Sequence, residues 1–273
     1  MKKIFAYQVI LLLLSLSFIV ASCGDDDERS YNIITEDYWF VPDTFTYKGF
    51  KYEAIDEQTA LLYPKVSYQN LYDVQIPLTV PYDRYTLKVA IIGNFAFFRC
   101  NNLKSVVISD NVKKINDSAF GECVELEQVH LGNGVKKIGE MAFAICKKLQ
   151  SITIPDGVET IELQAFFACE KLEQIELPQN LNSVKYEAFS GCKSLRKIEL
   201  PKTIKEIGEH AFGGCTSLES FVCGAQQPPT LGTDVFKDVN LANSTLYVPS
   251  GSVDIYKAAD QWKEFGTILA KEN

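Results

Sequence analysis

Few residues of this 273-residue chain have the types and spacing that catalysis needs. The two histidines, His130 and His210, lie far apart in the sequence and form no imidazole pair, so we interpret each as a variable surface residue. Glu176 and Glu199 are expected roughly 5 Å apart on adjacent strands, a separation that retaining glycosidases use. Lys197 flanks this pair, however, and there is no nucleophile elbow, phosphate-binding glycine loop or H-E-x-x-H motif. We therefore predict that the protein is not an enzyme and needs no cofactor.

Cysteines are the second group that could do chemistry. Of the eight in the chain, six recur every 23 residues, at Cys100, Cys123, Cys146, Cys169, Cys192 and Cys215. In an exported protein this even set allows disulfides, but a bonded framework requires only pairs, whereas here every copy has its cysteine. We favour a column of small, buried, reduced side chains. No C-x-x-C or Cys/His spacing indicates a zinc site.

The elements that position these residues follow a strict 23-residue repeat. Each copy has the dipeptide Ala-Phe, then a cysteine three residues after the phenylalanine and a leucine three residues after the cysteine. The dipeptides begin at Ala96, Ala119, Ala142, Ala165, Ala188 and Ala211. A fixed period of this length is typical of a solenoid, in which one coil is too small to bury its own apolar face and stacks on its neighbours.

Each copy has two apolar segments. Leu149, Ile152 and Ile154 form the L-x-x-I-x-I pattern of a short strand whose alternate side chains point into the coil, and Val158 and Ile161 form a second apolar pair. The sequence therefore predicts a β-rich solenoid whose terminal coils need caps.

The repeat unit resembles that of the BspA-like leucine-rich-repeat proteins of bacterial cell surfaces. The unit A-F-x-x-C-x-x-L-x-x-I-x-L-P-x-x-V-x-x-I-G is almost complete from Ala188 to Gly208. The resemblance implies a leucine-rich-repeat right-handed superhelix. We expect an N-terminal β cap at residues 38–90, five full repeats plus a partial one at residues 91–223, and a C-terminal cap at residues 224–273 with a short helix near Ser252 to Phe265.

The N-terminus predicts export and lipid attachment. Lys2 and Lys3 precede an apolar run that is too short for a membrane span but typical of a secretory signal peptide, which we place at residues 1–22. The end of this segment and Cys23 match a lipobox, in which the cysteine thiol receives a diacylglycerol. The alternative is an ordinary signal peptide followed by a chance cysteine. A multiply acylated Cys23 would hold the chain on a membrane.

An acidic tether at residues 23–37 follows and includes Gly24-Asp25-Asp26-Asp27-Glu28. It resembles the stretch that directs some lipoproteins to the outer leaflet of the bacterial outer membrane, although most charge runs are simply solvated. We favour surface display over retention in the periplasm. Loss of Lys2 and Lys3 with the signal changes the net charge from −8 to −10, which argues against nucleic acid as a partner.

The outward positions of the repeat strands are the candidate binding surface. They vary between copies while the inward positions do not, and they predict a flat face that contacts a protein ligand on a host, a neighbouring cell or the matrix. A merely solvated sheet has the same pattern. The candidate residues are Gln128, His130, Ser151, Thr153, Gln174, Glu176, Lys197 and Glu199.

Glycan binding is the alternative. Nine of the 13 tyrosines lie between Tyr31 and Tyr85, alongside Trp39, and exposed aromatic rings stack on sugars. We favour their burial in the small β cap. The three functional hypotheses are thus an adhesion or interaction lipoprotein, a carbohydrate-binding accessory lipoprotein and a passive structural lipoprotein.

Overall fold

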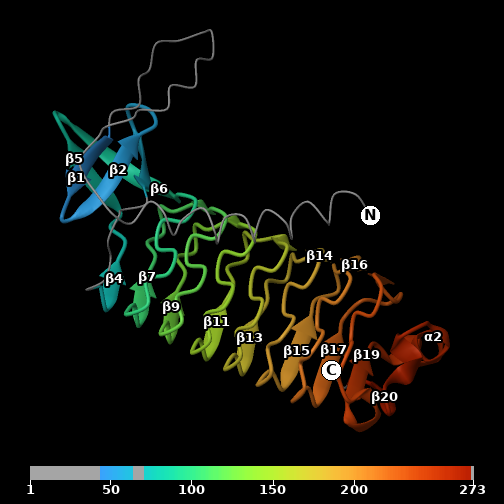
Figure 1. Cartoon of the computed structure of the whole chain (residues 1–273). Coiled ribbons are helices and arrows are strands. Elements are labelled where there is room, and N and C mark those ends of the chain that lie inside the picture. The colour runs from blue at the N-terminus through green and yellow to red at the C-terminus, as the bar shows by residue number, and fades with distance from the viewer. Residues whose placement is uncertain (1–43, 64–70, 272–273) are drawn as a thin grey trace, which may run out of the picture. The chain divides into compact units, whose positions relative to one another are not determined.

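The computed structural model describes residues 44–63 and 71–271. These residues form a β-solenoid of short, mostly parallel strands with little helix (Figure 1), so the predicted leucine-rich-repeat fold is confirmed. The predicted signal peptide, Cys23 and the acidic tether lie outside the described residues.

The N-terminal β cap is a small sheet joined to the first coil. Strands β1, β2 and β3 pair antiparallel in sequence order, and β5 pairs antiparallel with β6. Strand β6 also pairs in parallel with β3 on one side and with the repeat strand β8 (Lys114–Ile115) on the other, so the cap continues directly into the solenoid. The cap strands are β1 (Thr44–Tyr47), β2 (Phe50–Ala54), β3 (Thr59–Tyr63), β5 (Thr79–Tyr82) and β6 (Tyr85–Ile92).

One row of parallel strands follows the L-x-x-I-x-I segments. It is organised as two ladders, β4 to β13 and β15 to β20, each of consecutive coils paired in parallel. The strands are β4 (Asp73–Gln75), β7 (Ser105–Val107), β9 (Gln128–His130), β11 (Ser151–Thr153), β13 (Gln174–Glu176), β15 (Lys197–Leu200), β17 (Ser220–Cys223), β19 (Thr245–Val248) and β20 (Thr267–Ala270).

The second apolar pair of each repeat forms a second row of two-residue strands. After β8 these are β10 (Lys137–Ile138), β12 (Thr160–Ile161), β14 (Ser183–Val184), β16 (Glu206–Ile207) and β18 (Thr230–Leu231). Each coil therefore has two inward-facing segments, as the sequence pattern predicts, and their apolar residues line one continuous core.

A column of stacked phenylalanine rings occupies the Ala-Phe side of this core. Successive rings lie 5.0–6.1 Å apart between centroids and within 13° of parallel. Phe50 of the N-terminal cap packs edge-on against the first ring, and Trp262 packs edge-on against the last. The column consists of Phe97, Phe120, Phe143, Phe166, Phe189, Phe212 and Phe236, so both caps terminate the same stack.

The Ala-Phe turns have left-handed backbone on both sides of the dipeptide. In one coil, Gln164 and Ala168 have φ of +52° and +53°. The position equivalent to Ala168 is glycine in the next two coils, Gly191 and Gly214, where φ is +77° and +68°. Left-handed backbone costs a non-glycine residue roughly 1–2 kcal/mol, so the turn geometry is imposed by packing of the buried ring and thiol rather than by local preference.

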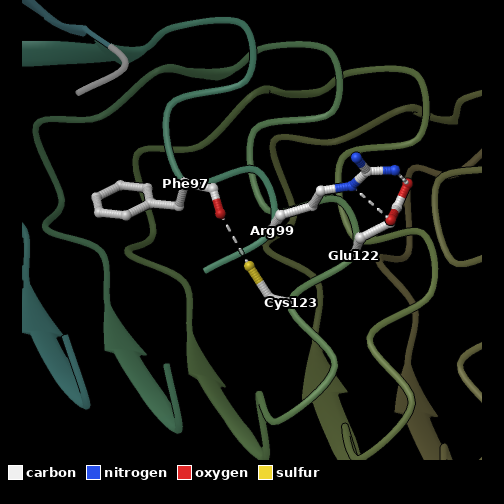
Figure 2. Close-up of polar contacts among 4 residues, drawn as sticks. All are labelled: Phe97, Arg99, Glu122 and Cys123. Carbon is white, nitrogen blue, oxygen red and sulfur yellow. Dashed lines mark hydrogen bonds and ion pairs between the residues drawn. The ribbon is translucent and has the colours of Figure 1, made fainter. Parts of the chain in front are cut away.

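The repeat cysteines are unpaired, buried thiols, as we predicted. Each of five thiols donates a hydrogen bond to the carbonyl oxygen of the phenylalanine one coil earlier, over 3.0–3.3 Å. Figure 2 shows the first of these bonds, from Cys123 to Phe97, beside the ion pair between Arg99 and Glu122. Burial raises the pKa of Cys169 and Cys215 to about 12, so these thiols stay protonated.

The repeat architecture continues beyond residue 223, where the A-F-x-x-C pattern has already ended. Strands β19 and β20 extend the first row, β18 extends the second, and Phe236 extends the ring stack. The short 3-10 helices of this segment are η1 (Leu241–Asn243), η2 (Ser250–Ser252) and η3 (Trp262–Glu264).

The C-terminal helix is shorter than the sequence pattern suggests. Helix α2 spans Val253–Ala258, and the chain leaves the helical conformation at Ala259, whose backbone is extended. Gln261 then adopts φ of +62°, and its side chain accepts a hydrogen bond from Val235 N and donates one to Gly232 O, so a tertiary contact holds the chain directly after the helix. Within the described ranges, no helix is both long enough and apolar enough to cross a membrane.

Candidate binding face

The outward side chains of four adjacent strands form the repeat face, which we define as the eight candidate residues on β9, β11, β13 and β15. All eight are exposed, while the residues between them on β11, β13 and β15 are buried. Figure 1 shows these strands side by side along the solenoid. The residues are Gln128, His130, Ser151, Thr153, Gln174, Glu176, Lys197 and Glu199.

Strand register aligns the repeat face in two columns. Ser151 pairs in register with Gln128 on one side and with Gln174 on the other, and Thr153 pairs with Glu176. Parallel neighbours in register lie about 4.8 Å apart, so one ligand segment can contact several coils at once.

Four of these side chains are available to a ligand. Across residues 44–63 and 71–271, no side-chain hydrogen bond or ion pair is made by Gln128, His130, Ser151 or Gln174. They supply amide, imidazole and hydroxyl groups, each of which can donate and accept hydrogen bonds. The N-terminal part of the repeat face is therefore polar, exposed and free to bind.

The other four side chains hold one another. Thr153 Oγ1 donates to Glu176 Oε2 over 3.0 Å, and Lys197 Nζ lies 3.3 Å from Glu199 Oε2. Lys271, beyond the end of β20, bonds the other oxygen of Glu199. The hydrogen bond from Lys271 and the charge of Lys197 lower the pKa of the Glu199 carboxyl.

The two glutamates bind different partners. Strands β13 and β15 belong to different ladders, and each carboxylate has its own partner, Thr153 for Glu176 and the lysines for Glu199.

The repeat face has different neighbours at its two ends. Towards the N-terminus, Val107 is 41 % exposed, and Ser105 bonds Asp73 of β4 over 2.5 Å. Towards the C-terminus, Val222 stands at an outward position of β17 but is only 5 % exposed. Sequence alternation predicts that Val222 faces solvent, but two further strands, β19 and β20, follow β17 in this ladder, and Val222 pairs in register with Tyr247 of β19.

The second histidine lies in the Ala-Phe turns and not on the repeat face. His210 is 3.9 Å from Glu187 through Nδ1 and 3.9 Å from Asp234 through Nε2, both at equivalent positions in adjacent coils. No three His, Cys, Asp or Glu side chains in the described part of the chain are grouped so that they could hold a metal ion.

Fold and surface together define a leucine-rich-repeat protein. The sequence matches the family described as BspA type Leucine rich repeat region, in six copies over residues 84–166 and 136–259. Because these ranges cover more than half of the chain, the protein belongs to this family, and the resemblance seen in the repeat unit is confirmed. No curated protein matches the chain.

Among solved structures, the chain is similar to a leucine rich cell surface protein from Faecalibacterium prausnitzii, with a TM-score of 0.52 and 20 % identity over 84 % of this chain and 73 % of that one. This likeness shows a shared fold. A leucine-rich repeat protein from Bacteroides capillosus is 28 % identical over 49 % of this chain and 96 % of its own length, with a TM-score of 0.44. A leucine-rich repeat protein from T. pallidum is 22 % identical over 81 % of this chain and 93 % of its own length, with a TM-score of 0.44.

Proposed function

We propose that the protein is a cell-surface interaction protein that binds a protein ligand through the repeat face. The observation that carries this proposal is the exposure of all eight candidate residues on strands whose intervening side chains are mostly buried. Four of them have no side-chain partner within the described ranges, so their hydrogen-bonding groups lose only water on binding.

The chemistry of the repeat face favours a polar contact. Gln128, His130, Ser151 and Gln174 are polar, hydrogen-bonding side chains on three adjacent strands. Glu176 adds an acceptor at the edge of this group, with Thr153 donating to it. Such a surface fits a polypeptide whose backbone or polar side chains run across the strands.

To test this proposal, binding of the protein is measured on a panel of immobilised extracellular-matrix proteins and, in parallel, on a glycan array. We expect saturable binding to at least one matrix protein and none to the glycans. An empty result on both panels would contradict the binding proposal and favour a passive structural lipoprotein.

The location is part of the same proposal: a lipid on Cys23 anchors the chain to the bacterial outer membrane, with the solenoid displayed outside the cell. Support comes from the lipobox and acidic run in the sequence and from the F. prausnitzii relative, which is described as a cell surface protein. Cys23→Ala is expected to release the protein from the membrane fraction. Retention of the variant there would exclude the anchor, and protease shaving of intact cells tests display.

Glycan binding through the N-terminal cap is the second candidate. The cap tyrosines differ in exposure: Tyr52 is buried, whereas Tyr63, Tyr72 and Tyr85 are 39 %, 52 % and 38 % exposed. Exposed rings can stack on sugars. If the cap binds glycans, we expect binding on the glycan array. Tyr72→Ala should weaken that binding, and substitutions on the repeat face should leave it unchanged. The other aromatic residues of the hypothesis, among them Tyr31 and Trp39, lie outside the described residues.

A further inference from the structure

Strand β20 ends the first row of strands with an open edge. It pairs in parallel with β19, and within residues 44–63 and 71–271 no strand pairs with its other side. The burial of side chains also indicates that the row of strands ends at β20. Leu200, Cys223 and Val248 hold one inward position in three successive strands and are buried, whereas Ala270, next in register, is exposed.

The hydrogen bonds of β20 identify which backbone groups are open. Lys271 N donates to Val248 O over 2.7 Å, so the peptide groups of Lys271 face β19. Because these groups alternate along a strand, those of Leu269 and Thr267 also face β19. The N–H and C=O groups of Ile268 and Ala270 therefore point away from the solenoid, and the open edge presents two donors and two acceptors.

This edge lacks two of the usual protections against strand addition, which are charged residues and proline within the strand. Natural edge strands carry charged residues, proline or bulges that prevent pairing. Strand β20 has the sequence TILA, without charge or proline, and the following Lys271 is directed to Glu199 on its own chain. Leu269 is 46 % exposed, and Ile255 of helix α2, which packs against β20, is 37 % exposed.

We propose that β20 pairs antiparallel with β20 of a second copy of this chain, across a two-fold axis at Leu269. In this register Ile268 is opposite the partner's Ala270, and the two Leu269 side chains face each other. Directly opposed residues of an antiparallel pair exchange both backbone bonds at alternate positions. All open groups of Ile268 and Ala270 on both copies are then satisfied by four hydrogen bonds.

Side-chain alternation is compatible with this register and excludes a shift by one residue. A shift by one residue would place the inward Ile268 opposite an outward residue, which the pleat does not allow. In the symmetric register Thr267 is opposite the partner's Lys271, whose charge is already paired with Glu199, so no like charges meet. In this symmetric pairing each copy supplies the donors and acceptors that the open backbone groups of the other copy need. A second copy of the chain therefore fits this edge.

Disulfide trapping in the full-length chain tests the pairing. In the Leu269→Cys variant the two new thiols face each other across the axis, with Cβ atoms about 4.5–5.5 Å apart, close to disulfide geometry. In the matched Thr267→Cys variant the thiols are four residues out of register, about 13 Å apart. The unsubstituted chain is the control for disulfide-linked dimer formed by the natural cysteines, seven of which are buried.

After mild oxidation we expect a band of twice the chain mass on a non-reducing gel for Leu269→Cys, at least tenfold stronger than for Thr267→Cys. Adding Ala270→Pro to Leu269→Cys removes one open N–H and should abolish most of the band, with an unchanged melting temperature as the check of folding. No dimer for Leu269→Cys, or equal dimer for both cysteine variants, would overturn the proposal.

Discussion

Two kinds of side chain share the repeat face. Gln128, His130, Ser151 and Gln174 have no side-chain partner in the part of the chain that the structure describes, whereas Glu199 is held by two lysines. A ligand that contacts these four unpartnered side chains displaces only water, whereas a ligand that contacts Glu199 must compete with Lys271. We therefore propose that the centre of the ligand contact lies on β9, β11 and β13.

The tie between Glu199 and Lys271 can be tested by titration. Lys271→Ala removes the hydrogen bond that contributes most to the lowered pKa of Glu199, so this pKa should rise towards the ordinary glutamate value. Carbon-detected NMR of the carboxyl group measures it. Lys263→Ala is the matched control, because Lys263 pairs with Asp260 and not with Glu199. An equal pKa in both variants would contradict the assigned contact.

The buried thiols predict a loss of stability in alkali. The folded-state pKa of Cys169 is raised from 9.0 to about 12, so the unfolded state releases a proton that the folded state keeps. The stabilisation is complete below pH 9 and is lost as the pH rises towards 12, by up to about 1.4 kcal/mol per pH unit for each such thiol.

Urea unfolding at a series of pH values from 7 to 10.5 measures this loss. In Cys169→Ala the fall of the free energy of unfolding above pH 9 should be shallower than in the natural chain, because one titrating thiol is missing. Identical pH slopes would show that the thiols do not carry the effect.

The ring column is the element that ties the coils together. Phe166 lies between Phe143 and Phe189, with ring centroids 5.7 and 5.5 Å away, and is fully buried. Phe166→Ala should lower the free energy of unfolding by about 3–5 kcal/mol. The adjacent Phe167 is only half-buried and lies outside the column, so Phe167→Ala is the control and should cost clearly less. Equal losses would contradict the structural role of the column.

In the turns next to the rings, exchanging alanine and glycine at equivalent positions should change the stability of the protein in opposite directions. Ala168→Gly should stabilise the protein by about 1 kcal/mol, because Ala168 has left-handed backbone. Gly191→Ala should destabilise it, since φ is +77° and a Cβ there would lie 3.3 Å from Ala168 Cα. Thermal unfolding of the two variants checks the signs, and a stabilising Gly191→Ala would refute the turn geometry.

Elements with a repeating sequence could be predicted, and elements without one could not. The positions of Ile152 and Ile161, repeated in each 23-residue unit, predict both strand rows, because similar coils repeat the same contacts. The end of helix α2 could not be predicted, because the segment after it is held by contacts of Gln261 with Gly232 and Val235, which are distant in the sequence. Likewise, the eight exposed residues followed from alternation, but the contact of Glu199 with Lys271, 72 residues later, has no local signal.

For the whole molecule, the ends of the solenoid differ in how they close the stack. The N-terminal cap covers the first coil with antiparallel strands and with Phe50 against the ring column. At the C-terminus Trp262 covers the rings while β20 leaves a strand edge unpaired by any described strand. Between these ends the buried positions are nearly the same in every coil, whereas the outward positions of the strands differ from coil to coil, which is why we propose the outward columns as the binding surface.

Binding through the repeat face is tested most directly by the affinity of two matched variants for the extracellular-matrix protein that binds the natural chain on the immobilised panel. Ser151→Arg with Gln174→Arg changes the centre of the repeat face, and Glu159→Arg changes the net charge by the same +2 at an exposed position in the second apolar segment. We predict a dissociation constant at least tenfold higher for the face variant, about 1.4 kcal/mol or more, and an unchanged one for the control. Equal affinities of the two variants would contradict binding through the repeat face.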